Sequence, residues 1–375
     1  MVAAARSGLA EPSEPLPVLF LTYYDRIGAP SRYRYYQFFS RLQEADLEPT
    51  THFIQSERMY QMKERRQSKA LFALLVAGAY LKRMALLLFR GGRFPVWVVE
   101  KELFPFVPYW IERFFYRRGV RVIVDYDDAV FLKYDRGSGL TSLLNKNKIG
   151  KVMRRADVVF SGNEFISEYA SNAGASDIRW MPSVVDETKY QITDRSPVSA
   201  GTPVVIGWMG SYRNSRHVTS IAPALQRLAR TENFILRIVG GGRIAMPPEI
   251  NVEYRDWSEG HEVEEIRQFA IGIMPLENGD WEKGKCGLKL IQYLAAGVPV
   301  IATPIGVNAR IVVPGLNGYH ATTNDEWFAA LQHLLAEIRQ GRFLPAQCAD
   351  TVRDTFTVSA QAPAMVAAIK MLAAR

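Results

Sequence analysis

The sequence predicts two doubly wound α/β domains in series, on the strength of three observations. Apolar strand-like runs alternate with helical patterns along the chain, which is typical of parallel β-α-β units. The alternation restarts after a polar segment rich in proline, serine and threonine. A chain of 375 residues also suits two compact domains better than one. We therefore expect an N-terminal domain over 1–190, a linker over 191–202 and a C-terminal domain over 203–375.

The first domain is expected to contain five strands joined by helices. The predicted strands are short apolar runs bounded by turn residues, at 17–24, 51–55, 96–101, 121–128 and 156–163. One helix is predicted from Ser31 to Ala45, with Ser31 as its N-cap, and an aromatic helix is predicted over 106–119.

The second domain repeats the pattern with six predicted strands. These strands lie at 203–211, 234–242, 251–257, 271–276, 298–303 and 317–321. The predicted helices lie at 216–230 and 261–270, before Gly297, and at 326–340 and 359–375, and the last of them can pack back on the first domain. Ligands of such folds bind at the carboxyl ends of the strands, so the cleft between the domains is the expected site.

Composition and charge narrow the possible classes of protein. An apolar share of 48% and a charged share of 22% are those of a soluble globular protein. Cys286 and Cys348 form neither a disulfide framework nor a metal-ligand spacing, so a reducing cytoplasm and no metal site are expected. Residues 1–15 resemble a loose arm rather than a signal peptide, because they lack a long apolar core.

Most of the net positive charge belongs to the first domain. Residues 1–190 carry 28 Lys and Arg against 21 Asp and Glu, which is +7 of the total +8. An anionic partner is therefore expected there, and nucleic acid is one candidate. The chain has no zinc-finger spacing, aromatic RNA-binding signature or dispersed basic helix, so we expect no nucleic-acid partner.

The segment 58–93 raises the question of a membrane. It holds nine Lys and Arg and one acid, around apolar runs at 71–81 and 84–89. Lys82 and Arg83 interrupt the run, and a span needs about 20 uninterrupted apolar residues, so we do not expect it to cross a bilayer. Helices lying on an anionic membrane surface fit the pattern, and two core helices with solvated polar faces fit it as well.

Glycine-rich turns follow or precede several strands of the second domain. In the stretch 283–306, packing alone explains the helix face of leucine and isoleucine. Packing does not explain Gly284, Lys285 and Gly287, which place small and positive residues at the amino end of that helix. Such an end attracts phosphate through its free N–H groups and the helix dipole. A second turn contains Gly210 and Ser211 and is followed by Arg216, which could supply charge to a diphosphate. A tight turn with solvated arginines is the simpler alternative there.

These motifs carry a family resemblance. The order GWMGS, RIVGGG, IGIMPL, GKCGLKLIQYLAAGVPVIAT, PIGVN and PGLNGYHA resembles the nucleotide-sugar domain of GT-B glycosyltransferases, and more narrowly glycosyltransferase family 4, the glycosyl transferases group 1. Upstream, YYDRIGAPSRYRYYQF resembles the glycine loop and first helix of the acceptor domain. The resemblance implies a GT-B fold, with two Rossmann-like domains facing each other across a cleft.

The family's two glutamates are absent. The family has E-x-x-x-x-x-x-x-E in this stretch, with one glutamate for the donor sugar and one for the ribose. Matching the helix end YLAAG places these positions at Gly284 and Gln292. Gln292 can still hydrogen-bond ribose hydroxyls, Gly284 can contribute only backbone, and Glu282 lies two residues away.

The resemblance implies the remaining donor-side residues. Gly287 and Leu288 match the family's phosphate-facing Gly-Leu, and Lys289 lies on the same first turn. Arg216 stands near the family's phosphate-binding lysine, while Ser211 stands where an arginine is usual.

The stretch VDYDDAVF ends a predicted strand of the first domain and so is expected to face the cleft. Asp125-Tyr126-Asp127 mimics the metal-binding D-x-D of GT-A enzymes, but that fold has one nucleotide domain and does not repeat the α/β pattern. By resemblance, Asp127 occupies the place of a cleft histidine. We interpret Asp127 and Asp128 as an acceptor-side catalytic base or orienting pair, with a capping aspartate and a salt-bridged neighbour as the alternative.

The acceptor-side loop supplies the last candidates. Gly28 permits close approach of the backbone, and Ser31, Arg32 and Arg34 could meet donor phosphates across the cleft. Helix capping with exposed arginines is the alternative.

The expected function is that of a retaining, metal-independent glycosyltransferase of the cytoplasm. It would use a nucleotide-diphosphate sugar as substrate and no cofactor, act on a glycan or lipid-linked acceptor in polysaccharide or glycolipid synthesis, and lie peripherally on the inner membrane face. A degenerate GT-B protein that binds nucleotide or a partner without catalysis is the alternative, because both glutamates are missing.

Overall fold

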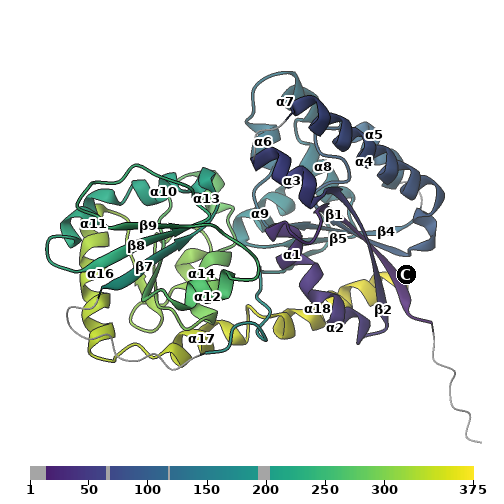
Figure 1. Ribbon diagram of the computed structural model, residues 1–375. Coiled ribbons are helices and arrows are strands. Elements are labelled where there is room, and N and C mark those ends of the chain that lie inside the picture. The colour runs from purple at the N-terminus through teal and green to yellow at the C-terminus, as the bar shows by residue number, and fades with distance from the viewer. Residues whose placement is uncertain (1–13, 65–67, 117–118, 193–202) are drawn as a thin grey trace, which may run out of the picture.

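The computed structural model of the protein describes residues 14–64, 68–116, 119–192 and 203–375 (Figure 1). The predicted N-terminal arm over 1–15 and the predicted linker over 191–202 therefore lie almost entirely outside the described residues.

The first domain is built on a parallel six-stranded sheet in the order β2-β1-β3-β4-β5-β6. Its strands are β1 (Leu16–Tyr24), β2 (Leu47–Gln55), β3 (Val96–Glu100), β4 (Arg121–Tyr126), β5 (Val158–Ser161) and β6 (Ile178–Trp180). The central strands are buried on both faces, which is why they are nearly continuous apolar runs. The edge strand β6 has only three residues, none of them buried, so no apolar run marked it in the sequence.

The second domain repeats this arrangement with the order β12-β11-β10-β7-β8-β9, again all parallel. Its strands are β7 (Val204–Met209), β8 (Phe234–Val239), β9 (Val252–Arg255), β10 (Ile271–Met274), β11 (Val300–Ala302) and β12 (Gly318–His320). The prediction of two doubly wound α/β domains is confirmed, and the two sheets form separate bodies in Figure 1.

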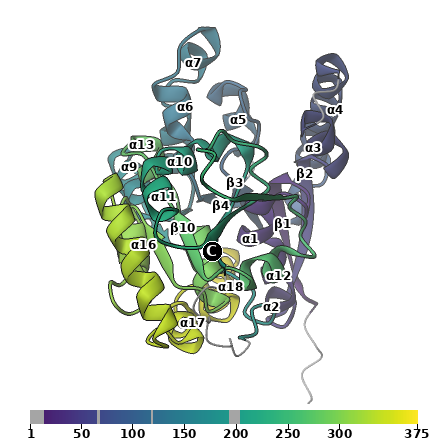
Figure 2. The same ribbon diagram turned by 60° about the vertical axis from the view of Figure 1, so that its left-hand side comes forward.

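Helices cover the first sheet and extend beyond it. They are α1 (Ala29–Arg34), η1 (Tyr36–Phe38), α2 (Phe39–Gln43), α3 (Glu57–Glu64), α4 (Lys69–Phe89), η2 (Gly91–Arg93), α5 (Tyr109–Tyr116), α6 (Phe131–Asp135), α7 (Leu140–Asn145), α8 (Lys148–Arg155) and α9 (Glu164–Asn172). Figure 2 shows α3 and α4, α5, and α6 and α7 projecting from the same end of this domain.

The predicted helix from Ser31 to Ala45 is wrong in two respects. The helix begins earlier, with Gly28 at the N-cap, and the segment is broken at Tyr35, whose φ of −136° and ψ of −61° are not helical. Ser31 lies inside α1 and does not cap it. Its hydroxyl instead donates to the buried carboxylate of Glu100 at 2.6 Å and accepts from the backbone N–H of Tyr24 at 3.0 Å.

The helices of the second domain are η3 (Tyr212–Asn214), α10 (Arg216–Thr219), α11 (Ala222–Leu228), α12 (Glu262–Arg267), α13 (Asp280–Lys283), α14 (Leu288–Ala295), α15 (Asn308–Ile311), α16 (Asn324–Arg339), α17 (Pro345–Arg353) and α18 (Val358–Ala373). The predicted helix over 216–230 is two helices, because Pro223 at the start of α11 has no N–H for the preceding turn. Gly297 ends α14 with a φ of +73°, as its position predicts.

The last helix, α18, belongs by packing to the first domain. Met365, Ile369 and Leu372 are buried against Val18 and Phe20 of β1, in the same apolar core. Figure 1 shows this yellow helix lying beneath the purple and blue domain. The end of the chain therefore returns across the molecule and joins the two domains a second time.

A buried arginine helps to hold helix α4 against the first domain. Arg83 is fully buried, and its guanidinium donates to the carbonyls of Thr22 and His52 at 2.6 Å each and of Leu103 at 3.0 Å. The other side of the helix exposes Leu81 and other apolar residues. By length and composition alone, α4 could cross a membrane, and it is the one such helix among the residues described here.

We expect Arg83→Met to lower the free energy of unfolding by about 3 kcal/mol, because buried carbonyls lose their donor. The neighbouring Lys82 is exposed, so Lys82→Met should change the value by less than about 0.5 kcal/mol. Urea unfolding of both variants checks this. Equal unfolding midpoints for the two would contradict the role given to Arg83.

Candidate functional site

The two domains meet where loops at the carboxyl ends of their sheets touch. A Cβ on Gly284 would lie 2.4 Å from Cβ of Ala129 and 2.9 Å from its backbone nitrogen. The thiol of Cys286 donates to the carbonyl of Asp127 at 3.0 Å, and the Asn163 amide donates to the carbonyl of Lys285 at 3.1 Å. The turn that precedes α14 is thus fixed against the first domain, and only glycine fits at position 284.

Two glycines bring Lys289 over the turn that follows β7. Gly287 has a φ of +67° at the N-cap of α14, where a Cβ would lie 2.4 Å from Ile311. A Cβ on Gly210 would lie 2.7 Å from Cε of Lys289, and the Lys289 ammonium lies 5.4 Å from the centre of the Trp208 ring. We call Gly210, Lys285, Gly287 and Lys289 the lysine site.

The lysine site carries positive charge without a matching acid. Among the residues that the structure describes, neither Lys285 nor Lys289 has a carboxylate oxygen within 4 Å. Burial, together with the charge of Lys285, lowers the pKa of Lys289 to about 7, and Asp128 only partly offsets this. A bound anion would relieve the repulsion, so the arrangement is suited to phosphate.

The predicted catalytic pair lies beside the lysine site and is asymmetric. Asp127 forms an ion pair with Lys101 at 2.9 Å, and although burial raises its pKa, the ammonium outweighs burial and leaves it lowered. Burial and the charge of Asp127 raise the pKa of Asp128. One carboxylate is thus held ionised while its neighbour holds a proton more readily, which suits proton transfer.

Asp125 does not join this pair. Its buried carboxylate accepts from Arg34, with the Nε contact at 2.9 Å, and Arg34 also donates to the carbonyl of Met181 at 2.7 Å. The two aspartates of the D-x-D pattern therefore lie in different places. Asp125 belongs to a buried ion pair with Arg34, and Asp127 lies in the loop that faces the second domain.

The acceptor-side residues make contacts that the sequence did not predict. Gly28 lies against Tyr24, where a Cβ would come within 2.3 Å of that side chain. Arg32 crosses to the second domain, where it forms ion pairs with Glu262 at 3.3 Å and Glu259 at 3.5 Å and lies 5.2 Å from the Trp257 ring centre. Ser31 is buried, as described above. Arg32 therefore joins the two domains and is already paired.

Gln292 is buried in the same network. Its amide donates to the hydroxyls of Tyr33 at 2.8 Å and Tyr190 at 3.2 Å, and Tyr33 in turn donates to Glu262. A glutamate at position 292 would have no N–H to donate and would compete with Glu262 for the Tyr33 proton. A glutamine therefore fits this network better than a glutamate would.

Ser211 directly follows Gly210 of the lysine site, and Arg216 begins α10. The side chain of Arg216 is 62% exposed and forms an ion pair with the buried Glu282 at 3.2 Å. Ser211 is exposed and accepts from Asn214 at 3.3 Å. Arg216 thus has a carboxylate partner, whereas Lys285 and Lys289 have none in the part of the chain that the structure describes. Leu288 is half-buried and packs against the second domain's core.

The sequence analysis missed Lys101, Tyr33 and Glu262. Lys101 follows β3 directly and has a φ of +65°, a strained conformation for lysine that positions its ammonium on Asp127. Its place at the carboxyl end of a predicted strand was a usable signal. Tyr33 and Glu262 are 229 residues apart, so no local pattern could connect them.

A cavity of about 300 Å³ opens at the same interface. Its wall combines Trp180 and Glu164 of the first domain with Lys283 and Arg310 of the second. An aromatic ring among charged side chains suits a polar ligand with apolar faces.

Comparison with known proteins identifies the fold. Residues 201–337 match the family model described as glycosyl transferases group 1. A protein assigned to teichuronic acid biosynthesis as glycosyltransferase TuaH, from Bacillus subtilis strain 168, is 21% identical over 181 residues. That match covers 45% of this chain and 46% of TuaH, so it spans about half of each protein.

Solved structures match over nearly the whole chain. Sucrose-phosphate synthase from Thermosynechococcus elongatus has a TM-score of 0.69 at 14% identity, covering 96% of this chain and 99% of that one. The chain has the GT-B fold. Anabaena HepE in complex with UDP has a TM-score of 0.62 at 11% identity, covering 95% of this chain and 100% of that one. The predicted resemblance to GT-B glycosyltransferases is confirmed.

In this GT-B chain, Gly284 lies in the contact between the domains. We expect Gly284→Ala to destabilise that contact by about 1–3 kcal/mol, because the added methyl group overlaps Ala129. Gly260→Ala is the control, since a Cβ there meets nothing within 4 Å. Thermal unfolding and the radius of gyration from small-angle scattering check this. If Gly284→Ala changed neither the melting temperature nor the radius of gyration, Gly284 and Ala129 would not be in contact between the domains.

Proposed function

We propose that this GT-B protein is a glycosyltransferase that transfers a sugar from a nucleotide-diphosphate sugar to an acceptor. The observation that carries the proposal is the lysine site, where Lys289 lies at a glycine-lined helix end with a lowered pKa and, among the described residues, no carboxylate in ion-pair contact. The fold and the group 1 match over residues 201–337 support it. Structures of HepE are described as complexes with UDP, with UDP and glucose, and with UDP-glucose, which supports a nucleotide sugar as donor.

The proposed mechanism places the diphosphate of the donor on the lysine site. Negative charge grows on the leaving nucleotide as the sugar bond breaks, and fixed cations and backbone N–H groups at the end of α14 would stabilise it there. Gly210 and Gly287 would let the backbone approach the phosphates. The proposal includes no cofactor and no essential metal, and it assigns retention of anomeric configuration from the family resemblance.

The acceptor would bind on the first domain, beside Asp127 and Asp128. We propose that Asp127 orients the acceptor hydroxyl, because the Lys101 ion pair holds its carboxylate ionised. Asp128, whose pKa is raised, would exchange the proton of that hydroxyl. A glycan or lipid-linked acceptor of cell-surface polysaccharide or glycolipid synthesis fits the proposal, and the match to TuaH supports that class. The proposed location is the cytoplasm, at the inner membrane face.

A panel of UDP-, GDP- and ADP-sugars, supplied with membrane extract, tests the function through release of free nucleotide. We expect release from one donor class, and Lys289→Ala should weaken nucleotide affinity by about tenfold or more, as loss of a charge-assisted contact implies. The exposed Lys370→Ala is the control and should bind normally. Tight nucleotide binding without turnover on any donor would instead assign the non-catalytic alternative. Unchanged affinity in Lys289→Ala would remove the phosphate assignment.

Membrane association is the second part of the proposal. The outer side of α4 exposes Leu74, Leu81 and Phe89, which are 67–83% accessible. Lys82 directly follows Leu81, and Arg90 directly follows Phe89. The helix therefore combines apolar and basic groups, as surface-binding helices do. We expect flotation with vesicles that contain anionic lipid, at low salt, and loss of flotation in Leu81→Ser/Phe89→Ser. Leu344→Ser, at an exposed site of the second domain, is the control. If the parent protein did not float with these vesicles, the proposed binding of α4 to a membrane surface would be wrong.

A further inference from the structure

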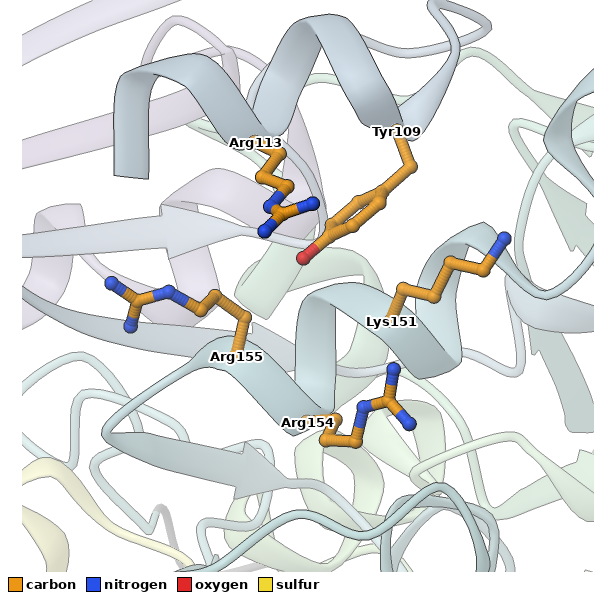
Figure 3. Close-up of a pocket in the computed structure, with 5 residues that line it drawn as sticks. All are labelled: Tyr109, Arg113, Lys151, Arg154 and Arg155. Carbon is orange, nitrogen blue, oxygen red and sulfur yellow. The ribbon is translucent and has the colours of Figure 1, made fainter. Parts of the chain in front are cut away.

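A basic pocket lies on the first domain, outside the interdomain site. It is formed between α5 and α8, has a volume of about 280 Å³, and is lined by Tyr109, Arg113, Lys151, Arg154 and Arg155. Figure 3 shows the side chains of Tyr109 and Arg113 descending from one helix toward the helix that carries the other three. Helices α5 and α8 end just before β4 and β5 begin, so the pocket's arginines lie toward the opposite end of the sheet from Asp127.

Among the described residues, no acid forms an ion pair with the cations of this pocket. Helix α8 contains no acidic residue, and the one acid of α5, Glu112, is fully buried on the inner side. There it forms an ion pair with Lys148 at 2.9 Å and accepts from the N–H of Leu103 at 2.8 Å. Within the described part of the chain, none of the four cations lining the pocket has a carboxylate oxygen within 4 Å.

The pocket is partly fixed by other contacts. Arg155 donates to the carbonyl of Tyr116 at 3.0 Å, which ties the end of α8 to the end of α5. The side chain of Arg154 passes over Gly174, where a Cβ would lie 3.4 Å from its Cδ. Tyr109 is half-buried, and burial raises the pKa of its phenol against the opposing effect of Arg113 and Arg155, so it remains a hydrogen-bond donor at neutral pH.

Four like charges around one small cavity repel one another, and a multiply charged anion would remove that repulsion. Guanidinium groups match the geometry of phosphate oxygens, and the phenol and ammonium add donors from either side. We propose that this pocket binds a phosphate group of a ligand, separately from the lysine site. The four cations of this pocket also account for part of the net charge of +7 that residues 1–190 carry.

Two sources could supply such a phosphate, a lipid headgroup or a soluble phosphate. On α5, Trp110 and Phe114 follow the two pocket residues and are 73% and 53% exposed. An exposed tryptophan and phenylalanine beside a phosphate site are the groups that enter a lipid headgroup layer. The chemistry recognised is the same in both cases, so the experiment must separate the sources.

The test compares Arg113→Gln/Arg154→Gln with the control Arg230→Gln/Lys370→Gln, which removes two exposed cations from other surfaces. All four positions are exposed, so folding should be retained, and melting temperature checks this. Both pairs carry Lys289→Ala, so that the lysine site does not contribute. Titration calorimetry with inorganic pyrophosphate gives the soluble arm. Co-sedimentation with phosphatidylcholine vesicles, with and without phosphatidic acid, gives the lipid arm.

We expect the pocket pair to lose about tenfold or more in affinity in at least one arm, while the control pair keeps it. Loss in the pyrophosphate arm assigns a soluble phosphate, and loss only with phosphatidic acid assigns a lipid headgroup. Absence of saturable binding in both arms would overturn the proposal. Equal losses in the pocket and control pairs would also overturn it, because the effect would then be general charge.

Discussion

The contact between Gly284 and Ala129 is the constraint on which the proposed site depends. It fixes the turn before α14 against the loop after β4, and the bonds of Cys286 and Asn163 reinforce it. Through this contact, the amino end of α14 and the aspartates of the first domain face one another. The same contact leaves no room for a side chain at position 284, because the two domains approach closely there.

The distribution of ion pairs separates structural from functional charges. Arg34, Arg83 and Lys148 are buried, and their hydrogen-bonding groups are matched by carboxylates, backbone carbonyls or, at Nε of Arg83, the His52 ring. Such matching is what makes a buried charge tolerable. Lys285 and Lys289 lie at a helix end without it, within the described residues. Cations that a fold holds without an acid are the natural place to expect an anionic ligand.

The sequence predicted the sheets better than the site. Apolar runs identify every strand that is buried on both faces, whereas β6 is short and unburied and left no pattern. Gly287 and Lys289 could be proposed from the sequence as phosphate-site residues because helix-end chemistry is local. The parts that Arg32 and Gln292 play were not predictable, since Arg32 meets Glu262 across 230 residues and Gln292 meets Tyr33 across 259. Such contacts depend on how the two domains pack against each other. The local periodicity of the sequence predicts helices and strands but not that packing.

The pKa of the Lys289 ammonium, followed by NMR of lysine-labelled protein and assigned with Lys289→Arg, tests the proposed phosphate site most directly. We expect titration near 7 in the free protein, because burial and Lys285 disfavour the charged form. We also expect that pKa to rise when UDP is added, since a diphosphate stabilises the ammonium. Titration of the free protein at the ordinary lysine value of about 10.4, or no response to saturating UDP, would contradict the proposed phosphate site.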